Sequence, residues 1–311
     1  TEDVTIEPIE PRPPLPWQGQ PYSVKRHGVS ITNCDSEPVQ TPGCIQVHGA
    51  LLVLRPGSLT IVQASENCAD VIGHAAGSLI EQPVGRVLGE TGQDRLARFL
   101  AAEPTDDNPL YVFSVAGPGG GELDLTVHTQ PGAVLLEFEP AVGAAAWAAG
   151  PDFYALVKKS IVRLQGSDSL RDFCIALTDE VRAITGFDRV MVYRFHPDLH
   201  GEVVAESRRA DLPPWLGLHY PAEDIPLPAR EIFKKIWVRP MPEVAGGLAE
   251  MLPLVRPDTG RPLDMSFCAL RGPSVMYTEY LQNMRVKAGL TMPIRSGNDL
   301  WGLIACHHYA G

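Results

Sequence analysis

The chain lacks the features of secreted, membrane-spanning and nucleic-acid-binding proteins. Its six cysteines form no C-x-x-C pair and show no regular spacing, which in a chain of 311 residues favours free thiols in a reducing compartment. No run of ~18 apolar residues is present, so a membrane span is not expected. The acidic start Thr1-Glu2-Asp3 does not resemble a signal peptide, and the net charge of -11 is opposite in sign to a nucleic-acid-binding surface. We therefore expect a cytoplasmic protein without a membrane or nucleic-acid partner.

Common catalytic and phosphate-binding motifs are absent as well. The sequence contains no G-x-S-x-G elbow, no G-x-x-x-x-G-K-[ST] loop and no H-E-x-x-H pair. A cysteine-dependent enzyme stays open as an alternative, with Cys34 as the nucleophile and His219 or His307 as the base. The missing motifs favour a protein that binds a ligand over an enzyme.

The composition fits a globular protein of two domains. The apolar fraction is 44%, and 311 residues are enough for two domains of ordinary size. Residues 1–30 hold six prolines and little periodicity, which predicts an extended arm, whereas residues 141–150 are mostly alanine and glycine, which predicts a linker. We therefore place one domain at residues 31–140 and a second at residues 151–311.

The patterns in the first domain predict a sheet with helices on one side. Turn signals such as Pro56-Gly57-Ser58 and Gly117–Gly121 separate short apolar runs that are typical of strands. The spacing of Leu96, Phe99 and Leu100 predicts a helix over residues 93–102. The predicted strands cover residues 50–54, 59–62, 111–115, 123–128 and 134–138.

The second domain also has an α+β pattern, with a central antiparallel sheet. Helical spacing from Phe153 to Leu164 is followed by a second helix that begins at Asp168 or Ser169 and ends at Gly186. A third helix is predicted over residues 228–237. The turn at residues 296–299 predicts an antiparallel pair, and the predicted strands cover residues 189–195, 202–206, 290–294 and 300–307.

Several polar residues stand out against these patterns. Cys34 lies on the irregular segment 33–38, so it is the cysteine whose neighbours least resemble a buried core. Asp224 lies between two prolines, where it is either a loop carboxylate or the N-cap of the next helix. Arg239 and Arg271 have apolar surroundings and therefore need anionic partners, either carboxylates of the protein or a bound anion.

The sequence Cys306-His307-His308 lies near the end of the chain. Neighbouring residues of a strand point to opposite faces, so we do not expect His307 and His308 to share one metal ion. His307 is then either a hydrogen-bonding group in a pocket or a core histidine with satisfied bonds.

Four stretches in this order resemble the photosensory end of bacteriophytochromes, and the similarity runs from about Ile31 to the end. They are residues 34–49, 186–195, 220–226, and 264–284 continuing to 300–308. The resemblance implies a PAS domain followed by a GAF domain, with biliverdin, a linear tetrapyrrole, held in the GAF pocket. It also implies a figure-of-eight knot around Ile45, in which the N-terminal segment passes through a GAF loop.

The resemblance implies that biliverdin is attached to Cys34 by a thioether bond. The family uses a cysteine upstream of the PAS domain, and Cys34 matches that position. Plant and cyanobacterial relatives use a cysteine inside the GAF domain, where this chain has Met276.

The remaining site residues are expected from the same resemblance. Arg239 and Arg271 look like the propionate clamps, with Ser274 and Thr291 as further propionate contacts. Tyr193, Tyr220 and Tyr280 look like the aromatic cage of ring D, and His307 matches the histidine that bonds the ring D carbonyl. The aspartate whose backbone carbonyl faces the pyrrole nitrogens is Asp224, and the other expected pigment contacts are Met191, Ile225, Pro226 and Tyr277.

Tyr277 departs from the family pattern, because it stands where the family has a pocket histidine. Histidine titrates near neutrality, whereas tyrosine has a pKa near ~10 and offers one hydroxyl. We therefore expect pigment binding with an altered chromophore protonation, spectrum or photoconversion.

The resemblance also implies what lies outside this sequence. Relatives carry a PHY domain and an output region, usually a histidine kinase, and many form homodimers, for which Phe153, Leu156 and Ile161 are candidates. The main alternative is a GAF-type sensor of another ligand such as haem, with Cys34 incidental.

Overall fold

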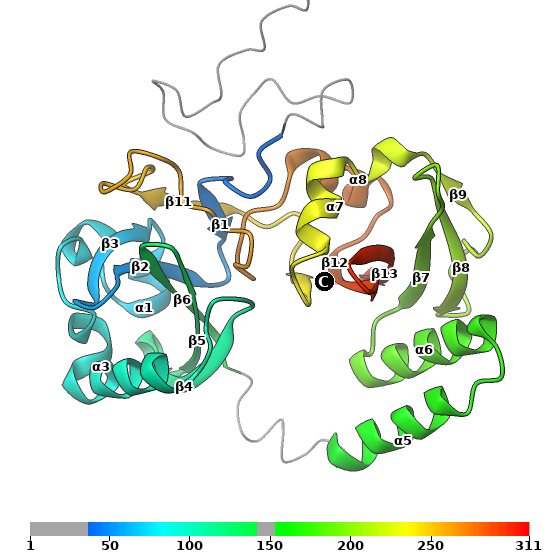
Figure 1. The fold of residues 1–311 in the computed structure, drawn as a ribbon, viewed down its shortest axis with the longest axis horizontal. Coiled ribbons are helices and arrows are strands. Elements are labelled where there is room, and N and C mark those ends of the chain that lie inside the picture. The colour runs from blue at the N-terminus through cyan, green and yellow to red at the C-terminus, as the bar shows by residue number, and fades with distance from the viewer. Residues whose placement is uncertain (1–36, 142–152, 311) are drawn as a thin grey trace, which may run out of the picture.

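The computed structural model describes residues 37–141 and 153–310, which form two antiparallel sheets with flanking helices (Figure 1). This confirms the predicted α+β class and the two antiparallel sheets. Among the described residues, no helix is both long and apolar enough to cross a bilayer.

The first sheet has seven strands and is covered on both faces. One face packs against α1 (Cys68–Ile72), α2 (Ala76–Leu79) and α3 (Gly85–Ala102), and the other packs against the segment between Leu263 and Leu270. Because both faces are buried, β2 is apolar from Ala50 to Leu54 instead of alternating, with Leu52 on one face and Leu51 on the other. The strand order is β1 (Cys44–Gln46), β11 (Leu248–Leu252), β3 (Thr60–Ser65), β2 (Ala50–Arg55), β6 (Ala133–Pro140), β5 (Glu122–Gln130) and β4 (Leu110–Ala116), with the 3-10 turn η2 (Pro118–Gly120) before β5.

The second sheet has six strands and one face that packs on helices. The helix α6 (Leu170–Thr185) lies on this face with α5 (Phe153–Gln165) beyond it, below the sheet in Figure 1. As predicted, α6 begins after Ser169, whose side chain accepts a hydrogen bond from Asp172 N, and ends at Gly186 with φ of 73°. The strand order is β10 (Arg239–Met241), β12 (Ala288–Ser296), β13 (Asp299–His308), β7 (Arg189–Phe195), β8 (Gly201–Arg208) and β9 (His219–Tyr220).

One strand from the second half of the chain joins the first sheet, which the sequence patterns did not predict. Although β11 lies between two elements of the second sheet in sequence, it pairs with β1 and β3 of the first sheet. On its other side β1 contacts residues 268–272, where Gln46 N donates to Leu270 O at 2.9 Å and Gly272 N donates to Cys44 O at 2.9 Å. The segment around Ile45 is thus held from two sides by residues 248–272, and the knot itself stays a prediction.

The helices differ from the predictions in extent and in number. The helix α7 (Leu227–Phe233) ends four residues before the predicted Trp237. The side chain of Asn108 donates to Lys235 O at 3.0 Å and accepts from Trp237 N at 2.8 Å, so these backbone groups have partners without a helix. The helix α3 is longer than predicted and is interrupted at Gly89 (φ 68°), and α1, α2 and α8 (Val275–Asn283) were not predicted.

We predict that Gly49→Ala destabilises the contact between the first sheet and residues 268–272. A Cβ at Gly49 would lie 2.6 Å from Phe138 O and 2.6 Å from Leu270 Cδ2, both closer than van der Waals contact. Overpacking of this kind lowers the free energy of unfolding by about 1–3 kcal/mol, which denaturant unfolding followed by circular dichroism measures. Gly77→Ala in α2 is the matched control, because a Cβ there meets no atom within 4 Å. Equal stability of the two variants would contradict the packing.

Candidate functional site

The face of the second sheet that points away from α6 carries most of the predicted site residues. In antiparallel pairing, residues that lie directly opposite each other on neighbouring strands share a face of the sheet. Arg239 is opposite Thr291, Thr291 is opposite Ala305, and Ala305 is opposite Met191. The intervening side chains, such as Val190 and Cys306, pack toward α6 instead. One face therefore forms the domain core, while the other carries Met191, Tyr193, Arg239, Thr291 and His307.

Arg239 and Arg271 form a buried pair of cations. Each is 6% exposed, and within the described ranges neither has a carboxylate within 4.0 Å. Arg239 donates to Ala269 O at 3.1 Å and to Arg271 O at 2.5 Å, while Arg271 donates to Ser266 O at 2.7 Å. Burial lowers the pKa of Arg239 to about 10 and that of Arg271 to about 9, so both carry a positive charge at neutral pH. The sequence left two alternatives for the partner of each arginine, a carboxylate of the protein or a bound anion. Among the described residues, neither arginine forms a salt bridge with a protein carboxylate.

The loop that carries Arg271 is held by the first sheet. Glu137 of β6 accepts a hydrogen bond from Leu270 N at 2.7 Å, and Gln46 of β1 donates through its side chain to Ala269 O at 3.4 Å and to Pro240 O at 3.2 Å. The positions of both arginines therefore depend on residues from the first domain. Sequence patterns did not single out Gln46 or Glu137. The one feature that could have marked them is that each is a polar residue within an otherwise apolar stretch.

Three tyrosines gather around Asp224 at the other end of the site. The ring centroids of Tyr193 and Tyr220 are 5.8 Å apart, and Tyr280 OH donates to Asp224 Oδ2 at 3.2 Å. Burial, followed by the charge of Asp224, raises the pKa of Tyr193 to about 12 and also raises that of Tyr280. The ring of Tyr193 lies against Gly201, where any Cβ would overlap it. The predicted aromatic residues are thus brought together.

The segment around Asp224 is fixed by an arginine that the sequence reasoning missed. Asp224 ends the 3-10 turn η3 (Ala222–Asp224), and Ile225 and Pro226 follow it, half-buried. Arg230 donates to Ile225 O at 2.6 Å and to Ala222 O at 2.9 Å. The N-cap of α7 is Pro226, so the alternative in which Asp224 caps that helix is wrong.

The helix α8 brings Ser274 and Tyr277 to the site. Tyr277 OH lies 3.5 Å from Thr291 Oγ1, and burial raises the pKa of Tyr277. Ser274 Oγ donates to Glu37 Oε2 at 2.7 Å. Cys34 lies outside the described residues.

His307 is a buried histidine with an incomplete set of hydrogen bonds. Its side chain is 6% exposed, and its Nδ1 has no partner in the described part of the chain. The ring of Trp215 contacts it edge-on at 5.8 Å, and Trp215 in turn covers Arg189, which forms an ion pair with Glu206. Burial, followed by the charge of Arg189, lowers the pKa of His307 to about 3. The alternative of a core histidine with satisfied bonds does not hold for this residue.

His308 points away from His307, as the strand alternation predicted. It pairs with Asp188 at 3.1 Å and contacts the ring of Phe187.

Comparison with known proteins agrees with this geometry. The family model described as "PAS fold" matches residues 34–141, and that described as "GAF domain" matches residues 169–311. The structure is similar to the chromophore-binding domain of the Stigmatella aurantiaca bacteriophytochrome, with a TM-score of 0.78 and 38% identity over 90% of this chain and 91% of that one. The chain belongs to the bacteriophytochrome family.

Other bacteriophytochromes and phytochromes match over similar lengths. The chromophore-binding domain of an unusual bacteriophytochrome from R. palustris gives a TM-score of 0.81 at 34% identity and covers 89% of each chain. Cyanobacterial phytochrome B of Nostoc sp. is 38% identical and the bacteriophytochrome of Pseudomonas aeruginosa 36% identical, each over 90% of this chain. The chain spans 37% of the length of these two curated relatives. Its fold and family are those of a phytochrome photosensory module.

We predict that His307 makes the protein less stable in acid. Its pKa is about 3 in the folded chain against an ordinary 6.5, so between these values only the unfolded chain takes up the proton. Stability therefore falls as the pH falls from about 6.5 toward 3, by roughly 1.4 kcal/mol per pH unit for one proton. His307→Gln removes this contribution, which denaturant unfolding of the pigment-free protein between pH 7 and pH 4 measures. His74→Gln is the matched control, and parallel pH profiles for wild type and His307→Gln would contradict the prediction.

Proposed function

We propose that the chain is a red/far-red light photoreceptor module that binds biliverdin covalently at Cys34. It would signal through isomerisation of the C15=C16 bond to an output region that these residues do not include. The observation that carries the proposal is the buried pair Arg239 and Arg271, neither of which has a carboxylate within 4.0 Å among the described residues. Arg239 shares one face of the GAF sheet with Tyr193 of the tyrosine cluster. Bound biliverdin would supply visible-light absorption and the isomerising double bond.

The residues present fit the two ends of such a pigment. Arg239 and Arg271 would bind the two propionates, since guanidinium groups bind carboxylates through paired hydrogen bonds. Thr291 would add a hydroxyl beside Arg239, its partner across the strands. At the other end, His307 would donate to the ring D carbonyl, with Tyr193, Tyr220 and Tyr280 enclosing that ring. Tyr193 OH and His307 Nδ1 are buried polar atoms without a hydrogen-bond partner among the described residues, and a ligand can satisfy them.

Asp224 and its neighbours would position the middle of the pigment. The carbonyl of Asp224 would face the pyrrole nitrogens, with Ile225, Pro226 and Met191 as apolar contacts. Ser274 would contact a propionate as expected, and its hydroxyl also donates to Glu37, three positions beyond Cys34 in the sequence.

Attachment through Cys34 is a simple addition reaction. The thiol adds across the A-ring vinyl group: one S–C bond forms, the vinyl π bond is lost, and the thiol proton goes to the other vinyl carbon. Met276 stands at the GAF position used by other phytochromes and has no S–H bond with which to add.

We further propose that the full-length protein is a cytoplasmic light-regulated histidine kinase with a PHY domain, acting as a homodimer. The residues described here would carry no catalysis of their own. Ile161 on α5 is 47% exposed and Leu156 is half-buried, so Ile161 is the better candidate for a dimer contact, while the side chain of Phe153 lies outside the description.

We expect Cys34→Ser to abolish covalent attachment of biliverdin. The measurement is absorbance of protein co-expressed with a biliverdin source, followed by zinc-dependent fluorescence on a denaturing gel. Wild type and the matched control Cys174→Ser should give a fluorescent band, and Cys34→Ser should give none. A band that survives in Cys34→Ser would refute the attachment site. A colourless wild-type protein would favour a GAF-type sensor of another ligand such as haem.

We expect Tyr277→His to change the pH dependence of the bound pigment's absorbance between pH 5 and pH 8. Tyr277 is half-buried with a raised pKa, and its hydroxyl contacts only Thr291 Oγ1 in the described hydrogen bonds, at 3.5 Å, so wild type has no group at this position that titrates between pH 5 and pH 8. Histidine titrates in this range. Tyr277→Phe is the control and should follow the wild-type curve; identical curves for all three proteins would show that residue 277 does not control protonation.

A further inference from the structure

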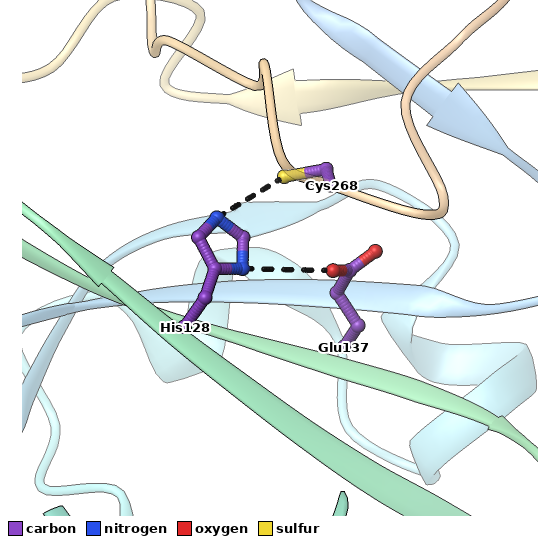
Figure 2. Close-up of side chains that lie close together, drawn as sticks. All are labelled: His128, Glu137 and Cys268. Carbon is purple, nitrogen blue, oxygen red and sulfur yellow. Dashed lines mark hydrogen bonds and ion pairs between the residues drawn. The ribbon is translucent and has the colours of Figure 1, made fainter. Parts of the chain in front are cut away.

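A second group of chemically active side chains lies outside the site described above. His128 of β5, Glu137 of β6 and Cys268 of the loop before α8 come together at the junction of the first sheet with that loop (Figure 2). All three are buried, with exposures of 0%, 0% and 3%. Buried polar groups are normally hydrogen-bonded, so a buried polar atom without a partner needs an explanation.

The contacts within this group are too long for ordinary hydrogen bonds. His128 Nδ1 and Glu137 Oε1 are 3.7 Å apart, and neither atom has a hydrogen-bond partner in the described chain. Cys268 Sγ lies 3.9 Å from His128 Nε2. One ligand atom from each residue lies within 4.8 Å of the other two. One ion can bind only one ring nitrogen of His128, because Nδ1 and Nε2 point apart. Two donors bound to one metal ion are about 3.5 Å apart, so Nδ1 and Glu137 Oε1, both unpartnered among the described residues, already lie near that spacing. Cys268 Sγ, which faces Nε2, would have to move toward them to complete the set.

We propose that His128, Glu137 and Cys268 bind one zinc-like divalent cation. Imidazole, thiolate and carboxylate are the ligands of zinc sites, whereas magnesium and calcium take oxygen ligands only. The other carboxylate oxygen of Glu137 already accepts from Leu270 N at 2.7 Å, the kind of outer hydrogen bond that fixes a metal-binding carboxylate. Water would complete the coordination.

The charges balance with and without the metal. Burial raises the pKa of both Glu137 and Cys268, so without a metal these two groups hold their protons and the group is neutral. A divalent cation would displace two protons, one from the carboxyl and one from the thiol, and the site would stay neutral. Binding therefore leaves no uncompensated charge in the interior, which would otherwise be costly.

Such an ion would connect the two halves of the molecule. His128 and Glu137 belong to the first sheet, whereas Cys268 is 131 positions beyond Glu137 and lies three residues before Arg271. The ion would fix the loop that positions the arginine pair. This inference does not depend on pigment binding, because none of the three residues is expected to contact the pigment.

The test is cobalt and zinc binding by the tag-free, pigment-free chain. Polyhistidine tags and tetrapyrrole nitrogens bind zinc themselves and would obscure the result. We expect about one zinc ion per chain after gel filtration, measured by elemental mass spectrometry. After unfolding with chelator and refolding with Co²⁺, a thiolate-to-cobalt charge-transfer band should appear and the Tm should exceed that of the metal-free protein.

Single substitutions test which residues bind the ion. Cys268→Ser should remove the charge-transfer band, and His128→Gln should lower cobalt affinity at least tenfold. Cys306→Ser, at a buried cysteine in the second sheet, is the matched control and should keep the band. His200→Gln should also keep it, although His200 Nε2 lies 3.0 Å from His219 Nδ1 on the surface, because that pair has no thiolate.

Two results would overturn the proposal. One is a wild-type chain that takes up no zinc and gives no charge-transfer band after refolding with Co²⁺, a result that needs no variant to fold. The other is a band that persists in Cys268→Ser, which would place the metal on another cysteine.

Discussion

The candidate site depends on the way in which residues 269–271 are held between the two sheets. The backbone of Leu270 donates to Glu137 and accepts from Gln46, both in the first sheet. On the other side, Arg239 at the edge of the second sheet donates to the carbonyls of Ala269 and Arg271. Buried backbone groups without partners cost several kcal/mol each in an apolar environment. Satisfying them in this way joins the two domains and fixes both arginines in the same step.

The two faces of the second sheet have different roles: one forms the apolar core, and the other carries the residues of the candidate site. Val190, Val192 and Cys306 pack on α6, and this apolar face supplies a stable core that does not depend on a ligand. The alternate residues carry arginine, threonine, tyrosine and histidine side chains, which a core would not select. Strand periodicity thus explains how a continuous run such as Arg189–Phe195 serves both purposes. In β2 the same alternation separates two apolar cores, because helices cover one face of the first sheet and residues 263–270 cover the other.

Local patterns were sufficient for the longer elements and insufficient for the connections. The strands β2, β3, β4, β5 and β6 and the helix α6 with both caps follow from periodicity and turn residues, which act over a few positions. The strands β1, β10 and β11 have three to five residues each, and β1 pairs with β11 about 200 positions away, so no local signal marks them. The sequence alone singled out Cys34, Asp224, Arg239, Arg271 and His307, whereas their roles and the other predicted site residues came from the family resemblance. It did not reveal Arg230, Arg189 or Glu137, whose partners are distant backbone and side-chain groups that only the folded chain brings together.

The arginine pair also implies that the site is built at a cost to the stability of the free protein. Arg239 and Arg271, with pKa values of about 10 and 9, are both charged at neutral pH, and each disfavours the charge of the other. Glu137 is a buried carboxyl whose charge would act on both arginines, but burial raises its pKa to about 8, so it supplies little negative charge at pH 7. A ligand with two carboxylates would provide the missing charge only in the folded chain, and binding to the folded state alone stabilises it. A sequence selected for stability alone would replace these arginines with apolar residues, so their presence is explained best by an anionic ligand.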